Sequence, residues 1–251
     1  MTSLALGPAA DTPLGRINPV AQLSAIVVVT LVLLTSLDLV TPAVVVAAEL
    51  CLLPAAGLTG PRVLWRRTWP MLLGATSVGL VNVLLSADAD ATDGVALALR
   101  VVGLALPGVL LVTTTDPVRL ADALTLHWHV STRFAFGALA ALRLVPLLVG
   151  EFEAVRLARR ARGVEARTPV ARVRLFAGIG FALLVGAVRR GSRLATAMDA
   201  RGFDSGIPRT NARGSELRPR DAVFVAGSIV VCAGAVVLSI VTGVWAPVFV
   251  G

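Results

Sequence analysis

Long apolar stretches are the feature that most constrains the fold of this chain. Hydrophobic residues make up 56% of its 251 positions, and the mean hydropathy is +0.84. Soluble domains are typically about 45–50% apolar, and a run of roughly 20 apolar residues matches the thickness of a bilayer core. The chain is therefore expected to be an integral membrane protein.

Five stretches approach the length of a membrane-spanning helix, at residues 20–36, 39–58, 69–87, 95–115 and 222–246. Between the second and the third, Pro61 to Arg67 contains three arginines and a tryptophan. Because arginine-rich loops face the cytoplasm, we expect this loop and the N-terminus to be cytoplasmic. The expected division is a cytoplasmic N-terminal segment, a four-helix transmembrane region, a cytoplasmic helical region, a linker and a C-terminal transmembrane helix, at residues 1–19, 20–115, 116–203, 204–220 and 221–251.

The central region is predicted to form helices that do not span. Asp116 as N-cap and Pro117 at the first helical position indicate a helix start. A second helix, from Ser131 to Arg162, has apolar residues three and four positions apart, so we expect it to lie along a surface. A basic helix that faces lipid would show the same periodicity. A third helix begins at Pro169, and its apolar core of about 14 residues favours an interfacial or buried position over a full span.

Both long helices end in the same triplet, Ala161-Arg162-Gly163 and Ala200-Arg201-Gly202. A glycine after a helical run is the usual left-handed cap, and an arginine in the last turn suits the helix dipole, worth about 0.3–1 kcal/mol. Each triplet could therefore be only a helix end. An arginine also presents a planar charged group that pairs bidentately with a carboxylate, and the glycine allows close backbone approach. The triplets are thus also candidate contact points for a partner.

The composition excludes several functions. The sequence contains no lysine, so the phosphate-binding loop G-x-x-x-x-G-K-[ST] cannot be present, and any ATP that drives the protein is expected to bind another chain. The net charge of +8 comes from arginines with few aromatic residues beside them, which favours an anionic lipid surface or an acidic protein over nucleic acid. We expect no cofactor in this chain.

Isolated polar residues leave two other functions open. Glu49 lies in the second apolar stretch, where a carboxylate is either functional or simply protonated or paired within the bundle. A membrane-embedded enzyme acting on lipids would use Glu49, the acidic loop at residues 88–93, or His127 and His129. These groups do not form a paired carboxylate or a nucleophile–base arrangement on one predicted face. A self-sufficient secondary transporter would be expected to show an inverted repeat, and none is obvious.

Four motifs occur in order between about residues 113 and 203: Thr114-Thr115-x-Pro117, Arg143-Leu-Val-Pro146 followed by Glu151, Arg159-Arg160-Ala161-Arg162-Gly163, and Ala195-x-Ala197-Met198-x-Ala200-Arg201-Gly202-Phe203. Together they resemble the transmembrane T component of energy-coupling factor (ECF) transporters, the EcfT/CbiQ type. The resemblance implies an all-α polytopic membrane protein with about five transmembrane helices and a cytoplasmic pair of long coupling helices between spans four and five.

The resemblance also implies a function and a set of partners. It implies a non-catalytic subunit in a prokaryotic cell membrane that binds two ABC-type ATPase subunits and a separate substrate-capture membrane subunit (the S component) for a vitamin or a transition-metal ion. The cargo is not specified, because in this family another chain selects it. The resemblance assigns ATPase contacts to Ala161, Arg162, Gly163, Ala200, Arg201 and Gly202, and support of the coupling helices to Arg143, Pro146, Glu151, Arg159, Met198 and Phe203.

Overall fold

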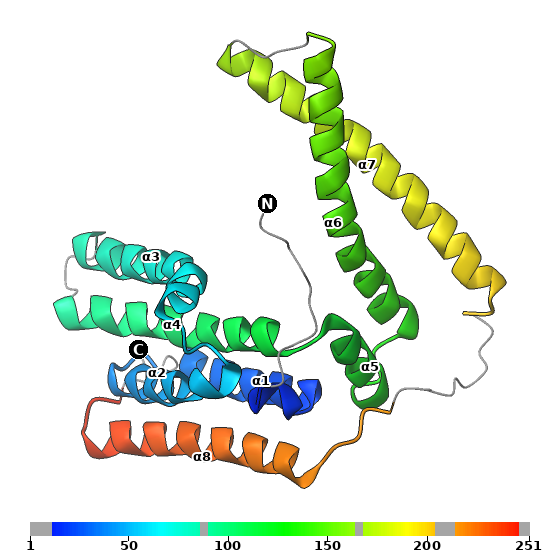
Figure 1. The fold of residues 1–251 in the computed structure, drawn as a ribbon. Helices are drawn as coiled ribbons and strands as arrows, with labels where there is room; N and C mark the ends of the chain where they lie inside the picture. Colours follow the sequence, from blue (N-terminus) through cyan, green and yellow to red (C-terminus); the bar gives the residue numbers. More distant parts are fainter. Residues whose placement is uncertain (1–11, 86–89, 164–167, 204–213, 246–251) are drawn as a thin grey trace. The chain divides into compact units, whose positions relative to one another are not determined.

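The computed structural model describes residues 12–85, 90–163, 168–203 and 214–245. The long elements of these residues are all α-helices (Figure 1). They are α1 (Pro19–Thr35), α2 (Val40–Leu52), α3 (Pro61–Leu85), α4 (Ala91–Thr114), α5 (Pro117–His127), α6 (Thr132–Ala161), α7 (Pro169–Ala200) and α8 (Pro219–Val241), with short 3-10 turns η1 (Leu14–Arg16) and η2 (Pro54–Ala56). The chain divides into two compact units: α6 and α7 form one, and the other helices form a bundle.

The bundle is built on α1, α2, α4 and α8, which pack against one another, while α3 lies along α4 (Figure 1). One core cluster joins α1, α2 and α8 through Leu33, Val45 and Cys232. Gly79 of α3 faces Gly94 of α4 so closely that a Cβ on Gly79 would lie 2.5 Å from the Gly94 carbonyl oxygen. Glycine at both positions therefore lets the two helix backbones touch.

Buried polar side chains tie helices that are far apart in sequence. The Gln22 amide of α1 donates to the Leu14 carbonyl at 2.8 Å, and its oxygen accepts from the hydroxyls of Thr114 and Thr115 at 3.3 and 3.2 Å. The Asp221 carboxylate of α8 accepts from the Asn18 backbone N–H at 2.8 Å. The first of the four sequence motifs thus helps to join the end of α4 to the start of α1.

Asp38 holds the α1–α2 turn against α8. One carboxylate oxygen accepts from the backbone N–H and the hydroxyl of Thr41, both at 2.8 Å, and from the Ser239 hydroxyl at 2.6 Å. All three residues are buried. Buried polar groups are stable only when they are hydrogen-bonded, so this cluster fixes where α2 begins.

The prediction of an all-α polytopic membrane protein is confirmed, but the helices that meet the length and composition of a span differ from those expected. Five described helices do so: α3, α4, α6, α7 and α8. The first two apolar stretches form shorter helices of 17 and 13 residues. The two long helices expected to lie along a surface are apolar enough to cross, because each contains a long apolar segment with at most two charged residues.

Two predicted boundaries were wrong. The stretch 39–58 is not one helix: α2 ends at Leu52 and a 3-10 turn starts at Pro54, which has no N–H to continue the helix. Gly57 then takes a left-handed conformation, with φ of 74°. The arginine-rich segment from Pro61, expected as a loop, is the first part of α3. Proline is well suited to the first helical position, and arginine is a good helix former.

The Asp38 cluster can be tested by removing its acceptor. Asp38→Ala leaves the Thr41 and Ser239 hydroxyls buried without their partner, and we expect it to lower the free energy of unfolding by about 2–4 kcal/mol. Ser239→Ala removes one bond only and should cost about 1 kcal/mol. Thermal unfolding of the purified chain in mild detergent measures both. An Asp38→Ala chain as stable as the unaltered one would contradict this role.

Candidate functional site

The α6–α7 unit is an antiparallel pair that buries little of its own surface. Its buried hydrophobic residues, within the described part, are Ala135, Leu139 and Ile179. The helices meet through Phe152 and Phe176, whose ring centroids lie 5.1 Å apart. Large apolar side chains remain exposed along both helices, and contiguous exposed apolar surface is typical of contact with lipid or a partner protein. They include Phe134, Leu142, Leu147, Val173, Phe181 and Leu184.

A charged pair also joins α6 to α7, through Glu151, which directly precedes Phe152. Both terminal guanidinium nitrogens of Arg190 donate to Glu151, with Nη2 lying 2.6 Å from Oε2 and Nη1 bonded to Oε1. Such a two-bond fork fixes orientation as well as distance. The side chains are 42% and 34% exposed for Glu151 and Arg190, so the pair stays in contact with its surroundings.

The side chain of Arg159, a residue of α6, reaches the backbone of α7. Its Nη1 lies 3.5 Å from the Leu175 carbonyl oxygen. A Cβ at Gly178 would come 3.3 Å from the same Nη1 atom. The glycine therefore leaves the space in which the arginine lies, and this places Arg159 in the contact between the two helices.

The first triplet closes α6 in a tight cap. Arg162 is the C-cap residue with φ −88° and ψ 9°, and Gly163 has φ of 72°. The Gly163 N–H donates to the Arg160 carbonyl at 2.9 Å. All three residues of the triplet are exposed. The local interpretation as a left-handed glycine cap is confirmed, and the arginine is accessible from outside.

The second triplet closes α7 in nearly the same geometry. Arg201 has φ −90° and ψ 10°, and Gly202 has φ of 72°. The N–H groups of Gly202 and Phe203 donate to the carbonyls of Asp199 and Met198 at 2.9 and 3.2 Å. This pair of bonds is the Schellman arrangement that satisfies the last carbonyls of a helix. We call the two triplets the arginine tips.

The two tips lie at opposite ends of the pair. The Phe203 ring, just after the second tip, packs edge-on against Phe136 near the start of α6, with centroids 6.3 Å apart. The first tip lies at the other end of α6, which is 30 residues long. Arg162 follows Phe136 by 26 residues, so at about 1.5 Å per residue the tips are separated by roughly 39 Å.

The remaining supporting residues divide into two groups. Arg143 and Pro146 lie on the exposed surface of α6, and the helix continues past the proline. Met198 and Phe203 line a groove of about 430 Å³ beside the second tip. Small residues of both helices form much of the remaining wall: Gly137, Ala140, Ala141, Gly191 and Ala195.

The residues of the alternative functions are not brought together. His127 Nε2 lies 2.7 Å from the Ser215 carbonyl oxygen, and the cavity that Glu49 lines contains no histidine or second carboxylate among the described residues. Asp88 lies outside the described residues, while Asp93 accepts from the Asp90 N–H at 3.2 Å at the start of α4. In the described part of the chain, no group of three or more His, Cys, Asp or Glu could hold a metal ion.

Sequence reasoning missed Arg190 as the partner of Glu151. The segment around it contains Arg189, Arg190 and Arg193, and composition does not show which of the three faces α6. Both residues lie eleven positions before the arginine of their tip, and this equal spacing is the signal in the sequence that could have pointed to Arg190.

Comparison with known proteins identifies the family. Residues 10–211 match the cobalt transport protein family CbiQ. The chain belongs to the CbiQ family. The matched region includes both arginine tips and the α6–α7 pair between them.

Relatives from several bacteria are similar to this chain. The EcfT transmembrane protein of energy-coupling factor transporters from Heliobacterium modesticaldum is 34% identical over 153 residues, covering 56% of this chain and 58% of that protein. The EcfT protein of Limosilactobacillus fermentum is 33% identical, covering 53% of each chain. A putative ABC transporter ATP-binding protein of Bifidobacterium longum is 28% identical over 77% of this chain, but over only 28% of its own length. The chain thus spans about half of the EcfT relatives and a smaller part of the third.

The cap geometry of the tips predicts opposite effects for two glycine substitutions. Gly163→Ala places a Cβ on a left-handed residue and is expected to destabilise the end of α6 by about 1–2 kcal/mol. Gly180→Ala is the matched control, because Gly180 lies inside α7 with open space around its Cβ position, and it should stabilise α7 by about 0.8–1 kcal/mol. Thermal unfolding compares the two. A Gly163→Ala chain that gains stability would contradict the cap.

Proposed function

We propose that this chain is the energy-coupling transmembrane subunit of an ECF-type ABC importer. It links ATP hydrolysis by two partner ATPase subunits to uptake of a vitamin or transition-metal ion by a separate S component. The observation that carries the proposal is the pair of exposed, structurally equivalent arginine tips at opposite ends of one helix pair. Family membership supports it, since several relatives of this chain are named EcfT.

The spacing of the tips favours two partner subunits over one. A separation of roughly 39 Å exceeds the diameter of a small domain, which is about 30 Å. Each tip therefore contacts a different subunit. The Bifidobacterium longum relative supports the identity of these partners, because a segment similar to this chain lies within a longer protein named for ATP binding.

The chemistry of each tip suits an acidic groove. Arginine remains charged at all physiological pH values and forms paired bonds with a carboxylate. The following left-handed glycine has no side chain to hold the partner backbone away. The chain itself is not the ATPase in this proposal, since a sequence without lysine has no phosphate-binding loop of the usual type.

The α6–α7 pair transmits motion in this proposal. When the ATPase subunits close on ATP, they displace the tips relative to each other, and the Glu151–Arg190 fork keeps the two helices in contact while they pivot about it. The exposed apolar side chains of α6 and α7 then form the surface that contacts the S component within the membrane of a prokaryotic cell. The N-terminus and both tips lie on the cytoplasmic side.

Reversing the charge of the tips tests the contacts. Arg162→Glu combined with Arg201→Glu should abolish co-purification of the ATPase pair and uptake of the cargo, because each tip then repels the carboxylates of its partner. Arg189→Glu combined with Arg193→Glu, both at exposed positions within α7, makes the same change of charge and should leave both unchanged. Pull-down in mild detergent and uptake by cells measure the two effects.

The assignment is wrong if the double variant still retains both ATPases and supports uptake. The unaltered chain, purified alone, should hydrolyse no ATP, and circular dichroism should show that the double variant keeps its helical content.

A charge exchange tests the fork. Glu151→Arg places two arginines together, and it should reduce uptake by about tenfold or more while each tip still binds its ATPase, since the binding surfaces are unchanged. Glu151→Arg with Arg190→Glu restores an ion pair in the reverse direction and should recover most of the uptake. Uptake and pull-down in the same strains distinguish the effects. Equal uptake in the single and the exchanged variant would show that the fork plays no part in coupling.

A further inference from the structure

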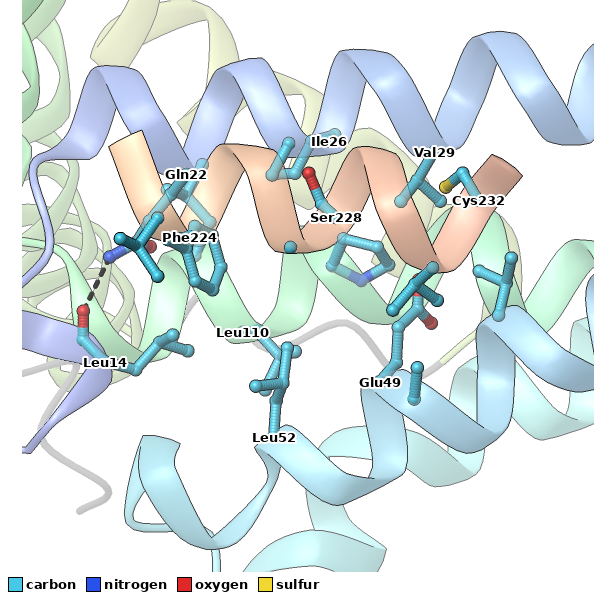
Figure 2. Close-up of a pocket in the computed structure, with 18 residues that line it drawn as sticks. Leu14, Gln22, Ile26, Val29, Glu49, Leu52, Leu110, Phe224, Ser228 and Cys232 are labelled. Carbon is cyan, nitrogen blue, oxygen red and sulfur yellow. Dashed lines mark hydrogen bonds between the residues drawn. The ribbon is translucent and has the colours of Figure 1, made fainter. Parts of the chain in front are cut away.

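A cavity of about 350 Å³ lies within the helix bundle, between α1, α2, α4 and α8 (Figure 2). Its wall is mostly apolar and includes Leu52, Leu110 and Phe224. The volume lies within the range of about 300–1,000 Å³ that is typical of small-molecule sites. Shape and lining therefore suit the alkyl part of a small ligand.

Glu49 places a carboxylate in this apolar wall. Among the lining residues it is the one with a charged side chain. The residue is only 5% exposed, and neither carboxylate oxygen has a hydrogen-bond partner among the described residues. Figure 2 shows the side chain extending from α2 into the space between the helices. A buried carboxylate without a partner is costly, so the site lacks a donor.

The other polar groups of the wall do not supply that donor. The Gln22 amide donates to the Leu14 carbonyl, and its oxygen accepts from Thr114 and Thr115. The Ser228 hydroxyl donates to the Val225 carbonyl of its own helix at 2.7 Å. A thiol such as that of Cys232 is a weak donor. A strong donor for Glu49 must therefore come from outside the described residues.

We propose that the cavity binds an amphipathic primary amine, with its ammonium group on Glu49 and its alkyl chain along the apolar wall. An ammonium carries three N–H donors, so one group can bond to both carboxylate oxygens and neutralise the charge. A neutral alcohol provides one donor and no charge. A metal ion would need further protein ligands, and the described residues offer no group of three.

The two cysteines of the chain provide a direct test. Cys232 lines the cavity, whereas Cys51 is exposed and does not. In a Cys51→Ser chain held in phosphatidylcholine nanodiscs, methyl methanethiosulfonate reports access to Cys232 by intact mass. Dodecylamine at about ten times its dissociation constant should slow the modification by about tenfold, since about one site in ten stays empty. Dodecan-1-ol, matched in chain length, should protect far less.

Glu49→Gln is the matched variant, because it keeps the size of the side chain and removes the charge. It should abolish the difference between the amine and the alcohol. The unfolding temperature provides a second measurement that does not depend on thiol access, and dodecylamine should raise it for the chain with Glu49 but not for Glu49→Gln.

Three results with the two dodecyl compounds would overturn the proposal. They are equal protection by dodecylamine and dodecanol, undiminished protection in a folded Glu49→Gln chain, and an absence of both protection and stabilisation by the amine. Protection given only by a co-purified membrane subunit would also overturn it in favour of a partner side chain. Nanodiscs containing phosphatidylethanolamine identify the source of the amine. If this lipid protects Cys232 without added amine, the ligand is a lipid headgroup. If dodecylamine protects Cys232 and the lipid does not, the ligand is a free amine.

Discussion

The helix bundle depends on hydrogen bonds between buried polar side chains of helices that are distant in sequence. Asp38 connects the α1–α2 turn to α8, Gln22 connects α1 to the end of α4, and Asp221 connects α8 to the segment before α1. In a membrane, apolar packing does not by itself select one neighbour, because lipid tails are as apolar as leucine. These few polar contacts are specific where the apolar contacts are not, and they determine which helices become neighbours.

The α6–α7 unit follows a different rule. It has few buried side chains and one charged fork, and most of its apolar surface is exposed. A helix pair of this kind gains little stability from its own core, so its conformation is easily biased by whatever covers it. The two units thus differ in kind. The bundle is held by specific buried hydrogen bonds, whereas the α6–α7 pair exposes an apolar surface.

The sequence was most informative where a local rule acts. Glycine after a helical run predicted both left-handed caps, and Asp116 with Pro117 predicted the start of α5, where the Asp116 carboxylate accepts from the Val118 N–H at 2.9 Å. It was least informative where the outcome depends on a contact in space. The choice of Arg190 over its neighbours, and the pairing of Gln22 with Thr114, cannot be read from periodicity. Composition also gave no means of separating a surface helix from a spanning one, since the apolar middle of α6 satisfies both.

The Glu151–Arg190 fork has a geometric meaning that follows from the tips. Glu151 precedes Arg162 by eleven residues, and Arg190 precedes Arg201 by eleven. In an antiparallel pair, two residues at the same distance from the C-terminal end of their own helix can meet only on the twofold axis that exchanges the helices. The fork therefore marks an approximate axis of symmetry, on which a negative group of one helix faces a positive group of the other. Two partner subunits related by the same axis would meet equivalent surfaces at the two tips. The opposite charges of Glu151 and Arg190 would still distinguish α6 from α7 at the centre of the pair.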